Sequence, residues 1–113
     1  MPARSEERTT RELLGPLAAV ALISQTHPTL PAPSVELATV FTDSGDHGLG
    51  VRLHLHEPAD GVYERWANII GSDDPDSHTR HTAEGEVRRR KTYGFYGTTP
   101  IELTGYPPAG RDA

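Results

Sequence analysis

Alternating apolar and polar residues predict a β-hairpin in the first half of the chain. Residues 49–56 (LGVRLHLH) place Val51, Leu53 and Leu55 on one side, with arginine and histidine side chains on the other. Residues 34–42 alternate in the same way, and the segment between the two runs is rich in Gly and Asp. This pattern is typical of two antiparallel strands with one apolar and one polar face.

A second hairpin is predicted near the C-terminus. Residues 86–96 and 101–106 have strand character, and the turn sequence Gly-Thr-Thr-Pro joins them. If the apolar residues of the first strand, Phe95 among them, point into the core, then Arg89 and Lys91 do so as well, because alternate residues share a face. A bulge or a later start of the strand would remove this conflict.

The segment 58–70 predicts a helix with one apolar side. Its apolar residues fall at positions i, i+4, i+7 and i+8 and form a single stripe: Val62, Trp66, Ile69 and Ile70. Pro58 suits the first turn of a helix, Asp60 is an alternative N-cap, and Gly71 suits the left-handed residue that often follows a helix.

Residues 9–26 predict an N-terminal helix. Thr9 and Glu12 have the spacing of a capping box, and Pro16 lies either in the first turn or at a kink. The side chains expected inside are Leu17, Val20 and Ala21, together with Leu22 or Ile23. The apolar run 13–23 also fits a signal-peptide core, but three acidic and three basic residues precede it and leave no net positive charge.

The composition fits one small domain. The chain has 113 residues, of which 35% are hydrophobic, so we expect a small core. A formal charge of −5 argues against a protein that neutralises many phosphates. The absence of cysteine is compatible with a reducing cytoplasm, and the longest apolar run is too short to span a bilayer. We therefore predict a cytoplasmic protein with no membrane contact.

The elements follow in the order α-β-β-α-β-β, which predicts a two-layer α+β domain with an antiparallel sheet of about four strands packed on helices. The expected divisions are a disordered tail (1–8), an N-terminal helix (9–26), a proline-rich connector (27–33), an α+β core (34–106) and a second tail (107–113). The residues expected in the hydrophobic core are Val51, Leu53, Leu55, Val62, Trp66, Ile69, Ile70, Ile101 and Leu103.

Four stretches carry a resemblance to known proteins: LP-x-P-S-V-x-L at 30–37, GVRLHLHEP at 50–58, WANIIGS at 66–72 and TYGFYGTTPIELTGY at 92–106. Over residues 30–107 the chain resembles small uncharacterised proteins of actinobacterial phages, plasmids and integrative elements. The resemblance implies a cytoplasmic accessory protein of a mobile element or phage-derived locus. It implies no activity and no functional residue.

Histidines provide one candidate site. His54 and His56 are two residues apart on a predicted strand, so both imidazoles face one side and can reach one metal ion. His78 and His81 follow in the loop after the second helix, and the four together would form a zinc or nickel site. Since the spacing does not match a recurrent zinc signature, we favour the alternative that the strand histidines lie on a solvated face.

A basic run provides the second candidate site. Arg88, Arg89, Arg90 and Lys91 could contact phosphates, with Tyr93 stacking on a base or contacting another partner. On a strand, however, these four charges divide between two faces. This division favours an edge strand that its charges protect from aggregation, with cross-strand pairing to an acidic residue.

The sequence contains no catalytic or phosphate-binding motif of the G-x-S-x-G, H-E-x-x-H or glycine-loop type. We therefore predict a non-enzymatic protein without a cofactor. Small size and polar rows on the predicted sheet (Arg52, His54 and His56; Glu102 and Thr104) indicate an interaction module that binds a protein partner or itself through a sheet face or edge strand. The alternatives are a nucleic-acid accessory protein and a histidine-based metal-binding protein.

Overall fold

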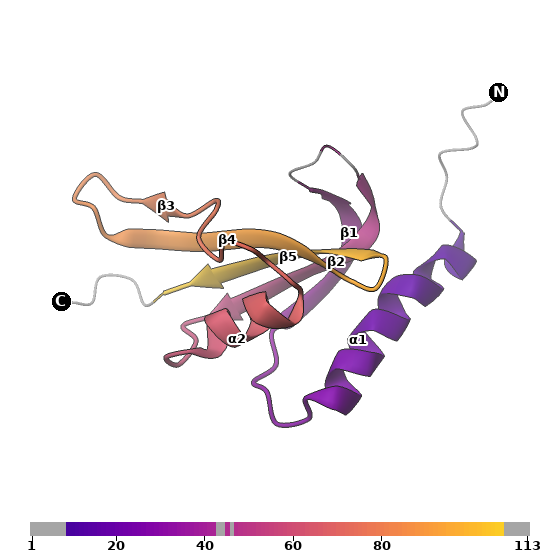
Figure 1. Ribbon diagram of the computed structural model, residues 1–113. Helices are drawn as coiled ribbons and strands as arrows, with labels where there is room; N and C mark the ends of the chain where they lie inside the picture. Colours follow the sequence, from indigo (N-terminus) through magenta and orange to yellow (C-terminus); the bar gives the residue numbers. More distant parts are fainter. Residues whose placement is uncertain (1–8, 43–44, 46, 108–113) are drawn as a thin grey trace.

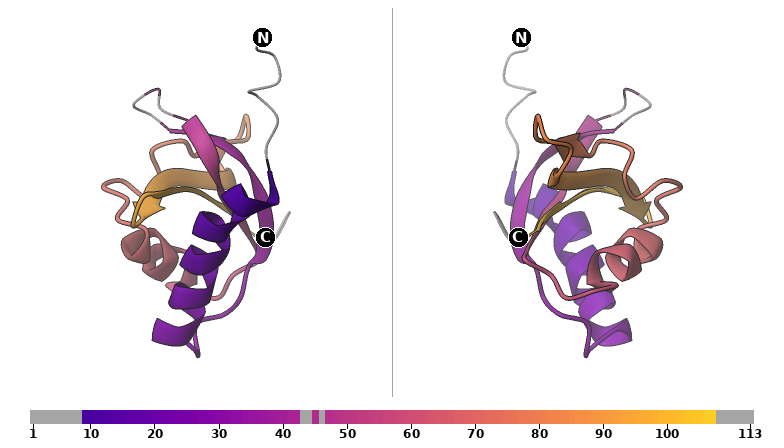
Figure 2. Two further views of the ribbon diagram at one scale, coloured as in Figure 1. Left: turned by 90° about the vertical axis from the view of Figure 1, so that its right-hand side faces the viewer. Right: turned by 90° about the vertical axis from the view of Figure 1, so that its left-hand side faces the viewer.

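The computed structural model describes residues 9–42, 45 and 47–107. Five strands form one sheet, and two α-helices lie on the same side of it (Figures 1 and 2). The elements are η2, a 3-10 helix (Thr10–Leu13), α1 (Leu14–Thr26), β1 (Ser34–Phe41), β2 (His47–His56), α2 (Val62–Ile69), β3 (Arg80–His81), β4 (Val87–Tyr96) and β5 (Thr99–Tyr106). The predicted α+β class is confirmed. The predicted tails, apart from residue 107, lie outside the described residues.

The sheet is mixed, so the expectation of about four antiparallel strands was wrong. Its strand order is β1-β2-β5-β4-β3, and the short β3 adds a fifth strand. Both expected hairpins are present, β1 with β2 and β4 with β5. They join through β2 and β5, which run parallel in the centre. After β2 the chain passes through α2 and the following loop and forms β4 two positions away in the sheet. It then turns back, and β5 fills the position between β2 and β4.

The hydrophobic core lies between the sheet and the helices. α2 packs on β4 and β5 and contributes Tyr63, Trp66 and Ala67 to the core, while α1 packs on β2 and β5. Of the residues expected in the core, Ile69 is half-buried. All the others are buried: Val51, Leu53, Leu55, Val62, Trp66, Ile70, Ile101 and Leu103. Burial of each large side chain contributes about 2 kcal/mol. α2 is shorter than expected because the left-handed Gly61 precedes its first residue.

The helix side of β4 carries Thr92, Gly94 and Tyr96, and not Phe95, which was expected in the core. Thr92 is buried, whereas Phe95 is 45% exposed. Gly94 lies against the Ile70 carbonyl, which accepts a hydrogen bond from the Phe95 amide at 2.8 Å. The pairing of β4 with β5 is continuous. Arg89 therefore points away from the helices on the same face as Phe95, and the expected conflict disappears because neither side chain lies in the core. The pairing of β4 with β3 does contain a register shift, opposite Arg80 and His81.

α1 packs with a different side from the one expected. Ala19 and Ile23 are buried, and Pro16 lies in the first turn, where its missing N–H costs no helical hydrogen bond. Of the residues expected inside, Leu17 and Ala21 are exposed and Val20 is half-buried against the core. Of the alternatives Leu22 and Ile23, Ile23 is the buried one. α1 has no charged residue, so the polarity of its sequence does not define one buried side. The expected capping box is present at η2, where the Thr9 amide donates to Glu12 Oε2 at 3.2 Å.

Candidate functional site

The face of the sheet opposite the helices carries the polar rows expected from the sequence. No helix in the described parts of the chain covers it (Figure 2). We call this surface the open face. Its central side chains come from β2, β5 and β4 and alternate with the core residues of the same strands: Arg52, His54, His56, Glu102, Thr104, Tyr106, Arg89, Lys91, Tyr93 and Phe95.

Charged side chains of opposite sign alternate across the open face. The Arg52 guanidinium lies 3.8 Å from the carboxylates of both Glu36 and Glu102. Lys91 Nζ lies 3.6 Å from Glu102 on the other side. These separations exceed ordinary hydrogen-bond distances, and such partly exposed pairs contribute about 0–1 kcal/mol each. The charges of the open face are therefore loosely paired.

Three flat rings stack at one end of the open face. The Tyr106 ring is nearly parallel to that of His56, with centroids 5.1 Å apart, and to that of His54, with centroids 6.1 Å apart. Tyr106 Oη also lies 3.5 Å from His54 Nδ1. The ring cluster is amphipathic, because its flat surfaces are apolar while its nitrogen and hydroxyl groups remain polar.

The open face also contains unpaired polar atoms. In the part of the chain that the structure describes, three buried side-chain atoms have no hydrogen-bond partner, and all three belong to open-face residues: Arg52 Nε, Arg89 Nε and Thr104 Oγ1. Thr104 is only 1% exposed. An unpaired buried polar group costs about 1–3 kcal/mol, and such groups are uncommon in folded proteins. The open face is therefore less completely satisfied than the rest of the described structure.

The histidines considered as metal ligands do not form one cluster. Across residues 9–42, 45 and 47–107, no three His, Asp or Glu side chains are placed to hold a metal ion. His54 and His56 stack with the Tyr106 ring. His78 packs edge-on against Tyr93, with ring centroids 5.2 Å apart. His81 lies in β3.

The basic run is divided between the two faces of β4. Arg89 and Lys91 belong to the open face, but Arg90 points toward α2. The Arg90 guanidinium donates hydrogen bonds of 2.7 Å to Glu64 Oε2 and Asp76 Oδ1. These hydrogen bonds lower the pKa of both carboxyl groups. Arg90 therefore ties the loop after α2 to the helix, and the four basic residues do not form one patch.

The same loop has further attachments to the core. The Tyr63 hydroxyl donates to the Pro75 carbonyl at 2.7 Å, and Thr92 Oγ1 donates to the Asp74 carbonyl at 3.0 Å. The Arg90 guanidinium lies over the Tyr63 ring, 4.2 Å from its centroid. These contacts attach the loop to both α2 and β4.

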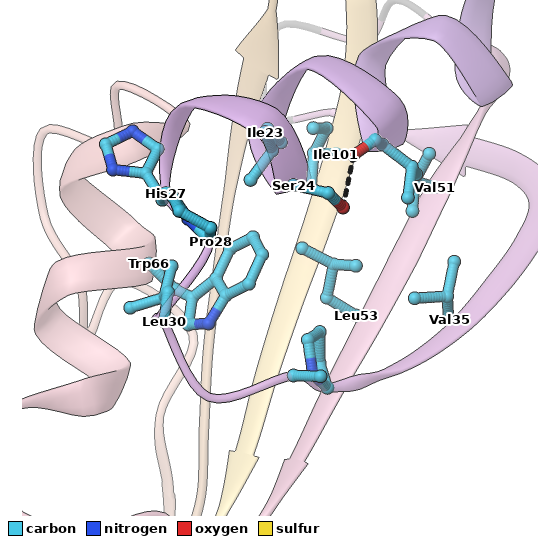
Figure 3. A pocket seen from close by; sticks show the side chains of 13 residues that line it. Ile23, Ser24, His27, Pro28, Leu30, Val35, Val51, Leu53, Trp66 and Ile101 are labelled. Carbon is cyan, nitrogen blue, oxygen red and sulfur yellow. Dashed lines mark hydrogen bonds between the residues drawn. The ribbon is translucent and has the colours of Figure 1, made fainter.

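A cavity lies on the helix side of the sheet, and the sequence did not indicate it. It has a volume of about 200 Å³ and lies between α1, the connector 27–33, the strands and α2 (Figure 3). We call it the α1 cavity. Its largest wall residue is Trp66, whose indole Nε1 donates to the Pro31 carbonyl at 3.0 Å. The prolines of the connector keep this segment extended beside α1, but they did not predict a cavity.

Comparison with protein-family models, with curated proteins and with solved structures gives no match to this chain. Within the described ranges, every helix is too short or too polar to cross a membrane.

Proposed function

We propose that this protein is a non-enzymatic binding module whose open face binds a protein partner. One observation carries the proposal: a sheet face without helices, in the described structure, combines loosely paired charges, stacked rings and all three buried side-chain atoms that lack a hydrogen-bond partner. Arg and Tyr are among the residues that contribute most to binding at protein interfaces. The absence of a catalytic motif from the sequence supports a binding role.

Charge distribution favours a protein over a nucleic acid as the partner. Glu36 and Glu102 lie among the cations of the open face and would repel phosphates. Arg90 is held by two carboxylates, which removes one of the four cations that a nucleic-acid surface on β4 would use. A protein surface with charges of both signs complements this arrangement better.

We further propose that the module is a cytoplasmic accessory protein of a mobile element or phage-derived locus. The support for this setting is the resemblance of residues 30–107 and the absence of cysteine. The identity of the neighbouring genes tests the setting independently of the binding experiment.

Site-specific photo-crosslinking in the native host tests the proposed surface. A photoreactive phenylalanine analogue replaces His56, an exposed residue of the open face, and in a matched control it replaces Arg65, an exposed residue of α2. We expect a discrete protein adduct from position 56 and none from position 65. Equal adducts from both positions, or none from either, would contradict the proposal. A nucleic-acid adduct from position 56 alone would support the alternative function.

A further inference from the structure

The α1 cavity is a built apolar space with an accessible rim. Its walls include one aromatic and several aliphatic side chains: Trp66, Leu53, Ile101, Ile23, Leu30 and Val35. In Figure 3, Leu53 and Val35 lie across from Trp66 and Leu30, and Ile23 reaches the space from α1. Val35 is 47% exposed, and Ser24 and His27 at the rim are exposed as well, so a small molecule can enter.

The lining defines the polarity of a suitable ligand. No Asp, Glu, Lys or Arg side chain lines the cavity, and burial of an unpaired charge in such a site is strongly unfavourable. The indole N–H of Trp66 is already bonded to Pro31, so the tryptophan offers only its carbon surface. A ligand of this cavity is therefore uncharged and mainly apolar.

One polar atom at the rim can orient the ligand. Ser24 Oγ donates its hydrogen to the Val20 carbonyl at 2.9 Å, a bond visible in Figure 3. Because its only hydrogen is used there, the hydroxyl oxygen can act toward a ligand only as an acceptor. A ligand hydroxyl would complete this interaction as the donor.

Volume and wall shape define the size of the ligand. In another protein, an apolar cavity of about 150 Å³ holds one benzene molecule. The α1 cavity, with about 200 Å³, therefore has room for one six-membered ring with one or two small substituents. The flat indole ring of Trp66 favours a flat ring over a branched aliphatic group. An empty space of this kind forfeits dispersion contacts, which such a ring would restore.

We propose that the α1 cavity binds an uncharged monocyclic aromatic molecule whose hydroxyl group donates a hydrogen bond to Ser24 Oγ. 4-Methylphenol has this chemistry and serves as the probe. The site lies on the helix side of the sheet, away from the open face. It is an additional function, independent of the binding of a protein partner.

The first experiment titrates 4-methylphenol into the wild-type protein. Trp66 is the only tryptophan of the chain, so its selectively excited fluorescence reports on the cavity, and saturation-transfer NMR reports contact from the ligand side. The charged comparison probe is 4-methylbenzoate at neutral pH. We expect saturable binding of the phenol, with at least about tenfold weaker binding of the benzoate. No signal from the phenol in either measurement, or equal binding of the two probes, would overturn the proposal.

The second experiment fills the cavity. Ser24→Leu places a larger side chain at the rim and removes the acceptor, while Gln25→Leu adds the same side chain to an exposed neighbour that does not line the cavity. Leucine favours helix in both variants. We expect Ser24→Leu to weaken 4-methylphenol binding by at least about tenfold and Gln25→Leu to change it by less than about twofold. Similar affinities in the two variants would assign the binding to another place and overturn the proposal.

Discussion

The two faces of the sheet use the same strands under different constraints. On the face covered by helices, Leu103 is fully buried, and Gly105 leaves space for the Tyr63 ring. On the open face, Arg52 and Lys91 approach their carboxylate partners only to 3.6–3.8 Å. On the covered face, the space available for packing therefore restricts which side chains fit. On the open face, side chains interact mainly through charge and hydrogen bonding. Alternate residues of one strand therefore have different roles. Those on the covered face stabilise the fold, and those on the open face are the ones that we propose to bind a partner.

The largest effect is expected at the centre of the covered face. Trp66→Ala removes the largest core side chain and should lower the free energy of unfolding by about 3–5 kcal/mol in urea denaturation. Its matched control, Arg65→Ala, alters an exposed neighbour on the same helix and should change this free energy by less than about 0.5 kcal/mol. Equal effects of the two substitutions would remove the contrast between core and surface.

A smaller loss is expected where the backbone of β4 meets α2. A Cβ atom on Gly94 would overlap the Ile70 carbonyl oxygen, so Gly94→Ala must displace α2 or the strand. We expect a loss of about 1–3 kcal/mol in unfolding free energy. Gly48→Ala is the control, because its Cβ would meet no atom within 4 Å and its φ is not in the left-handed region. A neutral Gly94→Ala would show that the two elements are not in tight contact.

The Arg90 cluster should make stability depend on pH. The hydrogen bonds from Arg90 hold the folded-state pKa values of Glu64 and Asp76 below their ordinary values of 4.5 and 3.8. Their stabilisation is therefore present at neutral pH and is lost as pH falls below these ordinary values and through the folded-state pKa values.

Arg90→Gln tests this dependence. Because both carboxylates are about half exposed, the substitution should cost only about 1 kcal/mol at pH 7, and the cost should shrink in strong acid. Urea denaturation at neutral and acidic pH measures the difference. A cost that stays constant across this range would mean that Arg90 stabilises the fold through its packing on Tyr63, not through the carboxylates.

The smallest effect on stability is expected on the open face. Arg52→Gln removes two ion pairs of 3.8 Å and a hydrogen bond of 3.5 Å to the Thr39 carbonyl, and it also removes a buried nitrogen that has no hydrogen-bond partner, so the losses and gains are both small. We expect the free energy of unfolding to change by less than about 1 kcal/mol. A loss of several kcal/mol in urea denaturation would show that the open face is also needed for the fold.

Sequence patterns predicted the pairing within each hairpin and the buried faces of β2, β5 and α2. The alternation along β2 and the Trp66 stripe depend on local periodicity, which the residues themselves define. The parallel pairing of β2 with β5 could not be predicted, because alternation specifies which side a residue faces and not which strand lies next to it. For β4, hydrophobicity was misleading, since close approach to α2 requires the small Gly94 and not an apolar residue.

The candidate sites also differ in how far the sequence could predict them. The polar rows of β2 and β5 were recognisable from the sequence, and the structure places them together on the open face. The α1 cavity was not, because it depends on the angle at which an uncharged helix and the connector 27–33 meet the sheet. Likewise, the contact of Arg90 with Asp76 depends on a loop path that no periodicity encodes.

The most direct test measures folding and recognition in one variant. Arg52→Gln is introduced together with the photoreactive residue at position 56, and both the unfolding free energy and the yield of protein adduct in the native host are determined. The expected result is near wild-type stability with loss of the adduct. Retention of the full adduct yield in the stable variant would contradict the assignment of partner binding to the open face.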